Sequence, residues 1–264
     1  MILVTGGTGK TGSRVAALLG SRARVASRHG PVPFDWHDPA TFASALAGVE
    51  AVYLVAPVGV SDLLPAMRPF LELAVAAGVE RFVLLSSSAL PEGGPMMGAI
   101  HAWLHQHVPS WVVLRPSWFM QNFSEGQHRL TIDSQGLIYS ATGEGRVAFI
   151  DAGDIAAVAA QALSAPDFPS GELILTGSVA LRYADVARII GDVLGRPVRH
   201  EHVSVEQLAR VYVQAGIPEE YASGLAALDL PIAAGSEDRT TGVVQRVTGR
   251  PARPFEEFAR DLCS

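Results

Sequence analysis

The residues best suited to chemistry lie at the start of the chain, where glycines stand at positions 6, 9 and 12 behind a short apolar run that ends at Thr5. Such a loop suits a dinucleotide pyrophosphate: one glycine makes the turn, one admits the phosphates to the backbone, and one lets helix and strand pack closely. The helix predicted over 13–19 would direct its N-terminal N–H groups at the phosphates. The spacing differs by one residue from the usual fingerprint and predicts the same chemistry.

Lys10 lies inside this loop and is the only lysine among the 20 lysine and arginine residues. Gly9-Lys10-Thr11 also resembles the end of a P-loop that binds nucleoside triphosphates. That loop requires a glycine five residues before Gly9, and Val4 stands there, within the strand. The dinucleotide interpretation is therefore the better one.

Cofactor type is indicated by the end of the second predicted strand, over 23–27. Folds that prefer NAD place an acidic residue about 20 residues beyond the glycine loop, on the ribose hydroxyls. Here the chain has Ser27, Arg28 and His29, with no acid. An arginine is a permanently charged bidentate donor that suits a 2′-phosphate, so we expect NADP(H).

The elements that must position these residues alternate along the first half of the chain. Apolar runs predict strands over 1–5, 23–27, 32–36, 51–56, 81–85 and 111–116, and amphipathic patterns predict helices over 13–19, 38–46, 62–77 and 100–107. This alternation is typical of an α/β fold with a Rossmann-like, doubly wound parallel sheet. After 117 the pattern changes to strands over 137–139, 147–151, 173–176 and 198–203, with helices over 154–163, 183–194, 205–215 and near the C-terminus. Asp154 is expected to cap the first of these helices.

The predicted domains follow from this change. Residues 1–125 form the NADP-binding domain, with 146–164 returning to it, and residues 126–145 and 165–264 form a smaller C-terminal α/β substrate lobe. The 264 residues are 48% hydrophobic with a net charge of −6, which disfavours nucleic acid and membrane surfaces as partners. The single cysteine, Cys263, a first strand that starts at Met1 and the absence of a long apolar run lead us to expect a cytoplasmic protein. Its expected partner is a small-molecule substrate, and its oligomeric state is left open between a monomer and a homodimer.

Several segments together resemble one family. The glycine loop, Arg28 and the segments 79–87, 114–122 and 149–156 are similar to the NmrA-like branch of the atypical short-chain dehydrogenases/reductases. Within it, the loop 5–12 and the segment 114–122 resemble the ergot-alkaloid type, the festuclavine and agroclavine dehydrogenases, which reduce a cyclic iminium with NADPH. The resemblance runs over nearly the whole chain.

The resemblance implies a set of site residues. The pyrophosphate would be held by Gly6, Thr8, Gly9, Lys10, Thr11 and Gly12. The 2′-phosphate would meet Ser27 and Arg28, the ribose side Ala56 and Pro57, and the nicotinamide ribose Ser86 and Ser87. The reactive end would be closed by Pro116 and by the substrate-pocket residues Trp118, Phe119 and Asn122.

The Tyr-x-x-x-Lys pair of ordinary short-chain dehydrogenases is missing, because no lysine follows Lys10. Gly93 and Met97 stand at the positions aligned with that pair, which leaves Ser88 and His101 as candidate proton donors. Reduction of an iminium needs only hydride, since the cation becomes a neutral amine. Positioning of the hydride donor and the acceptor then supplies most of the catalysis.

Other readings stay open at this stage. A quinone or enone reductase would take its proton from water, Ser88 or His101. A non-catalytic NADP(H) sensor of the NmrA kind would also lack the pair, and a non-redox isomerase or cyclase could use the same pocket. His101 and His105 are spaced as metal ligands can be, yet no third ligand is evident, so we expect surface histidines and no metal.

Overall fold

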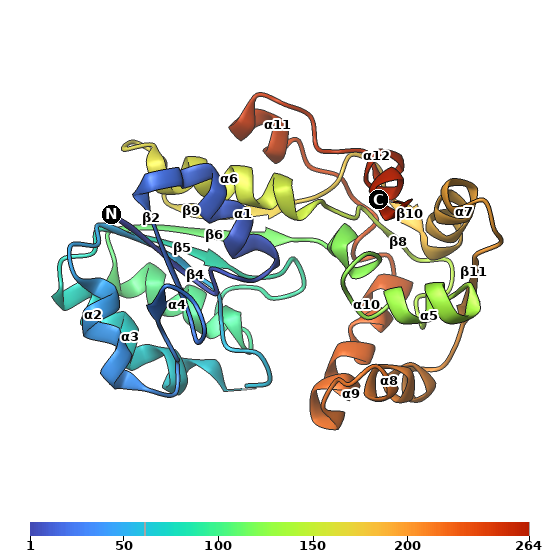
Figure 1. Ribbon diagram of the computed structural model, residues 1–264, viewed down its shortest axis with the longest axis horizontal. Coiled ribbons are helices and arrows are strands. Elements are labelled where there is room, and N and C mark those ends of the chain that lie inside the picture. The colour runs from blue at the N-terminus through green and yellow to red at the C-terminus, as the bar shows by residue number, and fades with distance from the viewer. Residues whose placement is uncertain (61, 264) are drawn as a thin grey trace. The chain divides into compact units, whose positions relative to one another are not determined.

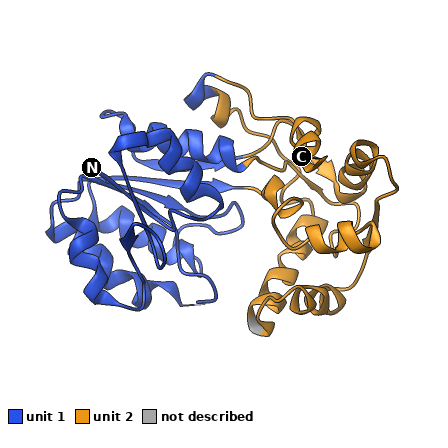
Figure 2. Ribbon diagram, viewed as in Figure 1, with its two compact units in different colours: residues 1–116, 152–175, 246–249 blue, residues 117–151, 176–245, 250–264 orange. Residues whose placement is uncertain are grey.

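A computed structural model describes residues 1–60 and 62–263 of the chain. They form two compact units (Figure 2). The first unit comprises residues 1–116, 152–175 and 246–249, and the second comprises residues 117–151, 176–245 and 250–264. Helix α11 (Val243–Thr248) contributes residues to both.

The first unit is built on a seven-stranded sheet in which every pair of neighbours is parallel. Its order is β3-β2-β1-β4-β5-β6-β9, which contains the 3-2-1-4-5-6 order of dinucleotide-binding folds. The predicted Rossmann-like fold is confirmed. The strands are β1 (Ile2–Thr5), β2 (Ala23–Ser27), β3 (Val32–Pro33), β4 (Ala51–Leu54), β5 (Arg81–Leu85), β6 (Ser110–Pro116) and β9 (Gly171–Leu175).

Helices cover both faces of this sheet (Figure 1). Helix α1 packs against α6, and α3 packs against α4. Because both faces are covered, the central strands are buried throughout and read as unbroken apolar runs. The helices are α1 (Lys10–Leu19), α2 (Phe42–Leu46), α3 (Leu63–Ala76), α4 (Met97–His107) and α6 (Ala152–Ser164).

The second unit has its own aromatic core. Phe123 lies 5.2 Å from Phe149 and 5.5 Å from Phe255 between ring centroids, and Tyr183 lies 5.3 Å from Phe149. Around this core stand two two-stranded sheets: β7 (Leu137–Ser140) with β11 (Arg199–His202), and β8 (Arg146–Val147) with β10 (Leu181–Arg182). The helices are α5 (Arg129–Gln135), α7 (Tyr183–Leu194), α8 (Val205–Gln214), α9 (Glu219–Ala227), α10 (Asp229–Ala233) and α12 (Phe255–Arg260).

The boundaries of the units differ from the predicted ones. Residues 165–175 belong to the first unit, because β9 pairs with β6. Residues 117–125 and 146–151 belong to the second, where Met120 N–H donates to the Ile150 carbonyl at 2.9 Å and Gln121 to Asp151 at 3.1 Å. Helix α6 begins at Ala152, so the prediction that Asp154 is its N-cap is wrong: Asp154 lies in the first turn.

Candidate cofactor site

The glycine loop connects β1 to the N-terminus of α1. Gly6 has φ +59°, a conformation that glycine adopts without strain, and Gly9 N–H donates to the Gly6 carbonyl at 2.9 Å. Gly9 is the N-cap residue of α1. The first helical hydrogen bond runs from Ser13 N–H to the Gly9 carbonyl at 3.0 Å. The backbone N–H groups of the first turn lie N-terminal to this bond and point out of the helix end, where an anion is favoured.

Steric limits explain two of the loop glycines. A Cβ at Gly12 would lie 2.3 Å from the Gly6 carbonyl oxygen, so only glycine lets the first turn of α1 pack on the loop. A Cβ at Gly7 would lie 2.8 Å from Val25 Cγ1 and 2.9 Å from the Val4 carbonyl oxygen. Gly7 was not among the predicted residues, although two adjacent glycines after a strand were a visible signal.

A cavity of about 360 Å³ lies beside the loop, entirely within the first unit. It collects residues from the carboxyl ends of β1, β2 and β4, the edge at which open parallel sheets bind ligands. Seven of the predicted cofactor residues line it: Gly6, Thr8, Gly9, Ser27, Arg28, Ala56 and Pro57.

Two side chains in this cavity have unused hydrogen-bonding capacity. Arg28 is exposed, and its guanidinium makes no hydrogen bond or ion pair with the described residues. The Ser27 hydroxyl is buried and has no hydrogen-bond partner among them. A Cβ at Gly30 would approach that hydroxyl to 2.6 Å, so the turn after β2 keeps the space around it. A 2′-phosphate fits these donors, because its oxygens can satisfy both.

Three further residues that line the cavity, Phe34, Trp36 and Val55, were not predicted from the sequence. Trp36 Nε1 donates to the Val55 carbonyl at 3.1 Å, and the ring of Phe34 lies edge-on to Trp36 at 4.9 Å. Asp35 also lines the cavity, where its Oδ1 accepts the His37 N–H at 3.0 Å. The alternating apolar run over 32–36 was the available signal, but it was read only as a strand.

Thr11 does not offer its hydroxyl to this cavity. The side chain is buried, and its Oγ1 accepts a hydrogen bond of 3.1 Å from the hydroxyl of Tyr53, whose pKa is raised by burial. The Thr11 side chain therefore connects α1 to β4. Its backbone N–H, in the first turn of α1, is the part of Thr11 that points toward the N-terminal end of the helix. Lys10 and Gly12 share that turn.

The serines after β5 are held by the end of β6. Ser88 N–H donates to the Pro116 carbonyl at 2.9 Å, and Arg115 donates to the carbonyls of Ser88 at 2.8 Å and Ser87 at 3.3 Å. The Ser86 hydroxyl is buried and lacks a hydrogen-bond partner among the described residues. This arrangement fixes the backbone of these serines at the carboxyl edge of the sheet.

His101 is not the surface residue that we expected. Its side chain is 1% exposed, its ring lies 5.2 Å from that of Trp111, and Nε2 is 3.8 Å from Glu92 Oε2. Burial lowers the pKa of His101, and the nearby Glu92 opposes this only in part. His101 is enclosed and is not among the residues that line the cofactor cavity, which argues against a role as proton donor to a ligand there.

His105 is exposed, as expected, with Nδ1 2.8 Å from Glu92 Oε1. Across the described residues, no group of three or more histidine, cysteine, aspartate or glutamate side chains is arranged to hold a metal ion.

The predicted substrate-pocket residues belong to the second unit. Trp118 and Phe119 are paired through their backbones with Ile150, and the Asn122 carbonyl accepts the His128 N–H at 3.1 Å. All three side chains are half-buried, and Trp118 packs against the aromatic core. Pro116, by contrast, ends β6 in the first unit, where it is buried.

Comparison with known proteins gives the family. A family model described as NAD(P)H-binding matches residues 6–166, and a model of the NmrA-like family matches residues 106–237. The chain belongs to the NmrA-like family. This NmrA-like protein is therefore an NAD(P)H-dependent oxidoreductase by family, and the matched NAD(P)H-binding region contains the glycine loop and the cavity.

Relatives of this NmrA-like protein match over nearly their full length. The oxidoreductase YesF of Bacillus subtilis is 46% identical over 98% of this chain and 93% of its own. The agroclavine dehydrogenase of Claviceps fusiformis is 40% identical over 98% and 96%. An NADPH-dependent quinone oxidoreductase of Escherichia coli, solved with NADPH, has a TM-score of 0.84 at 23% identity and covers 100% of both chains, which shows the shared fold. Within the described residues, no helix has the length and apolar character needed to cross a membrane.

Proposed function

We propose that this NmrA-like protein is an NADPH-dependent reductase that delivers hydride to the carbon of an iminium, or of a similarly electrophilic acceptor, in small-molecule metabolism. The observation that carries the proposal is the lack of a proton-donating pair: Lys10, the only lysine, lies on the phosphate loop, and His101 is enclosed. The 40% identity to an agroclavine dehydrogenase over nearly both chains supports this acceptor class.

The first unit would hold the cofactor. The first turn of α1 and the backbone of Gly6 and Gly9 would bind the pyrophosphate, while Arg28 and the Ser27 hydroxyl would bind the 2′-phosphate. Ser86 and Ser87 would meet the nicotinamide ribose, with Pro116 closing that end. When bound, the reduced nicotinamide supplies a hydride equivalent.

The acceptor explains why no acid is needed. Hydride adds to the iminium carbon, the carbon–nitrogen π electrons move onto nitrogen, and the cation becomes a neutral amine without any proton. Catalysis then depends on holding donor and acceptor close together while excluding water. In this proposal the second unit is the substrate lobe: Trp118 and Phe119 offer aromatic faces to the cation, and Asn122 offers a polar contact.

The test is an acceptor panel. The purified protein, NADPH and matched cyclic iminium, ketone, quinone and enone acceptors are combined, and NADPH consumption is followed by absorbance. The proposal expects turnover with the iminium and little with the ketone. Turnover with the quinone or enone alone would instead favour a quinone or enone reductase.

Binding of NADPH without turnover of any acceptor would point to a sensor. Conversion of an acceptor without NADPH consumption would point to an isomerase or cyclase. Either result would contradict the proposed function, and a calorimetric measurement of NADPH binding on the same preparation distinguishes both from an unfolded protein.

A further inference from the structure

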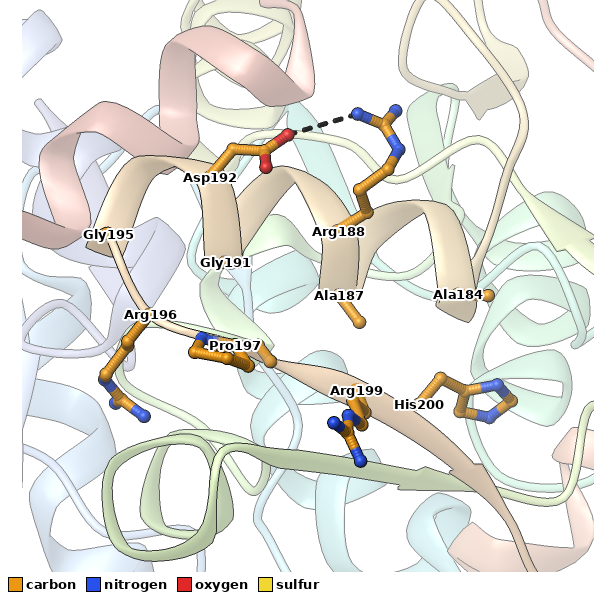
Figure 3. Close-up of a pocket in the computed structure, with 11 residues that line it drawn as sticks. Ala184, Ala187, Arg188, Gly191, Asp192, Gly195, Arg196, Pro197, Arg199 and His200 are labelled. Atoms are coloured by element: carbon orange, nitrogen blue, oxygen red, sulfur yellow. Dashed lines mark hydrogen bonds and ion pairs between the residues drawn. The ribbon is translucent and has the colours of Figure 1, made fainter.

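A groove of about 740 Å³ runs along one side of the second unit (Figure 3). Helix α7 forms one wall through Ala184, Ala187 and Gly191, and the segment from Gly195 to His200, which leads into β11, forms the other. The residues that line this groove are different from those that line the cofactor cavity, and the proposed NADPH site does not include them.

The strand along the groove has an unpaired edge. Strand β11 has one neighbour, β7, and the two are parallel. Arg199 N–H donates to the Gly136 carbonyl at 2.9 Å and Val203 N–H to the Ser140 carbonyl at 3.0 Å. Because backbone groups alternate in direction along a strand, those of His200 and His202 point away from β7. Within the described chain, no hydrogen bond reaches the backbone N–H or C=O of these two residues.

The charges of β11 alternate in a self-complementary way. Arg199 and Glu201 flank His200, share one face of the strand and are both exposed. The Arg199 side chain has no hydrogen-bond or ion-pair partner among the described residues. His200 is turned to the other face, where Nε2 lies 2.8 Å from Ser140 Oγ.

We propose that β11 pairs antiparallel with β11 of a second copy of this chain, about a two-fold axis at His200. The outward N–H and C=O of His200 then bond to His200 of the partner subunit, and a four-stranded sheet results. Arg199 lies directly opposite Glu201 of the partner subunit, and the two-fold axis creates this pair twice. A register centred one residue later would place the two copies of Glu201 face to face, which disfavours it.

Helix α7 is compatible with this arrangement. The residues that it presents to the groove are small, so two copies of the helix can approach closely across the same axis. Arg188 and Asp192 form an ion pair of 3.2 Å on the side of α7 that faces away from the β11 segment (Figure 3). Pairing with a copy also covers an edge that would otherwise invite aggregation.

Sedimentation equilibrium over a wide protein concentration range tests the proposal. The wild type is expected to dimerise. Glu201→Arg and Arg199→Glu each put like charges opposite one another twice, so each should weaken dimerisation by roughly tenfold or more. The double variant Arg199→Glu/Glu201→Arg restores opposite charges and should recover the wild-type dissociation constant.

Glu219→Arg on α9 is the matched control, because it makes the same charge change at an exposed site away from the groove. It should leave dimerisation unchanged. Circular dichroism and NADPH binding establish that each variant is folded. The proposal is overturned by a wild type that stays monomeric, by single variants that dimerise as the wild type does, or by a double variant that does not recover. A monomer that binds an extended acidic peptide in the groove would also overturn it.

Discussion

Arg28 decides cofactor preference at the scale of single residues. Arg28→Ala should lower the affinity for NADPH by about tenfold to a hundredfold, because a charge-assisted contact contributes roughly 1.5–3 kcal/mol. The affinity for NADH, which has no 2′-phosphate, should change little. Isothermal titration calorimetry with both cofactors measures the difference.

Arg68→Ala is the control for this prediction. Arg68 is an exposed arginine of α3 that pairs with Glu72 at 2.7 Å and does not line the cavity. It should leave both affinities unchanged. Equal losses of NADPH and NADH affinity in Arg28→Ala would contradict the assignment of Arg28 to the 2′-phosphate.

Asp229 makes stability depend on pH. Its side chain is 2% exposed, and Oδ2 accepts the Ala141 N–H at 2.7 Å. Burial raises the pKa of Asp229 from 3.8 to about 6, with the Ala141 bond opposing. The native state therefore binds this proton more tightly than the unfolded state. The stabilisation is complete below the unfolded pKa and is lost as the pH rises through about 6.

Asp229→Asn removes this titration while keeping an acceptor for Ala141 N–H. We expect the variant to be more stable than the wild type by about 2–3 kcal/mol in mildly alkaline buffer, because the wild type must bury a charge there. The difference should shrink as the pH falls below the native pKa. Urea unfolding at several pH values measures it, and a constant difference would contradict the assigned pKa.

The residue scale also shows the limits of sequence reading. Seven predicted cofactor residues line one cavity, because position after a parallel strand determines which loops meet at the carboxyl edge. The orientation of Thr11 toward Tyr53 and the enclosure of His101 by Trp111 depend on which partner fills the neighbouring space. Spacing along one helix cannot reveal that partner.

At the scale of elements, the junction of β1 and α1 depends on Gly12. Gly12→Ala would place a Cβ 2.3 Å from the Gly6 carbonyl oxygen, so helix or loop must shift. We expect a loss of about 1–3 kcal/mol in the free energy of unfolding, together with at least tenfold weaker NADPH binding. Chemical denaturation and calorimetry on the same sample measure the two effects.

Gly224→Ala in α9 is the matched control. No atom lies within 4 Å of a Cβ built there, and the residue sits within a helix. It should stabilise the protein by roughly 0.5–1 kcal/mol through helix propensity and leave NADPH binding intact. Unchanged NADPH binding in Gly12→Ala would contradict the role given to the junction.

Element prediction was strongest where local pattern and tertiary environment agree. The buried strands of the parallel sheet appear as apolar runs, and their alternation with helices predicted a doubly wound parallel sheet. The turn before α4 was not predictable: Met96 has φ +54° at the first central position of a turn closed by Gly98 N–H to the Pro95 carbonyl at 3.0 Å, a place where glycine is usual.

At the scale of the whole molecule, the chain returns twice to its first unit. Residues 152–175 bring α6 and β9 back to the sheet, and residues 246–249 follow later. The sequence indicated the return of the helix but not of β9, because a short strand after a loop carries no sign of which sheet it will join. Long-range pairing of β9 with β6 decides that boundary.

The central claim is that hydride passes from NADPH to an acceptor whose reduction requires no proton donor. An isotope-transfer experiment tests this claim most directly. NADPH carrying deuterium on the reactive face of C4 is incubated with the protein and a cyclic iminium, and the amine product is analysed by mass spectrometry and NMR. We predict one deuterium at the former iminium carbon for each NADPH oxidised. A product that carries only solvent hydrogen at that carbon, or no product with labelled NADPH still bound, would contradict the account.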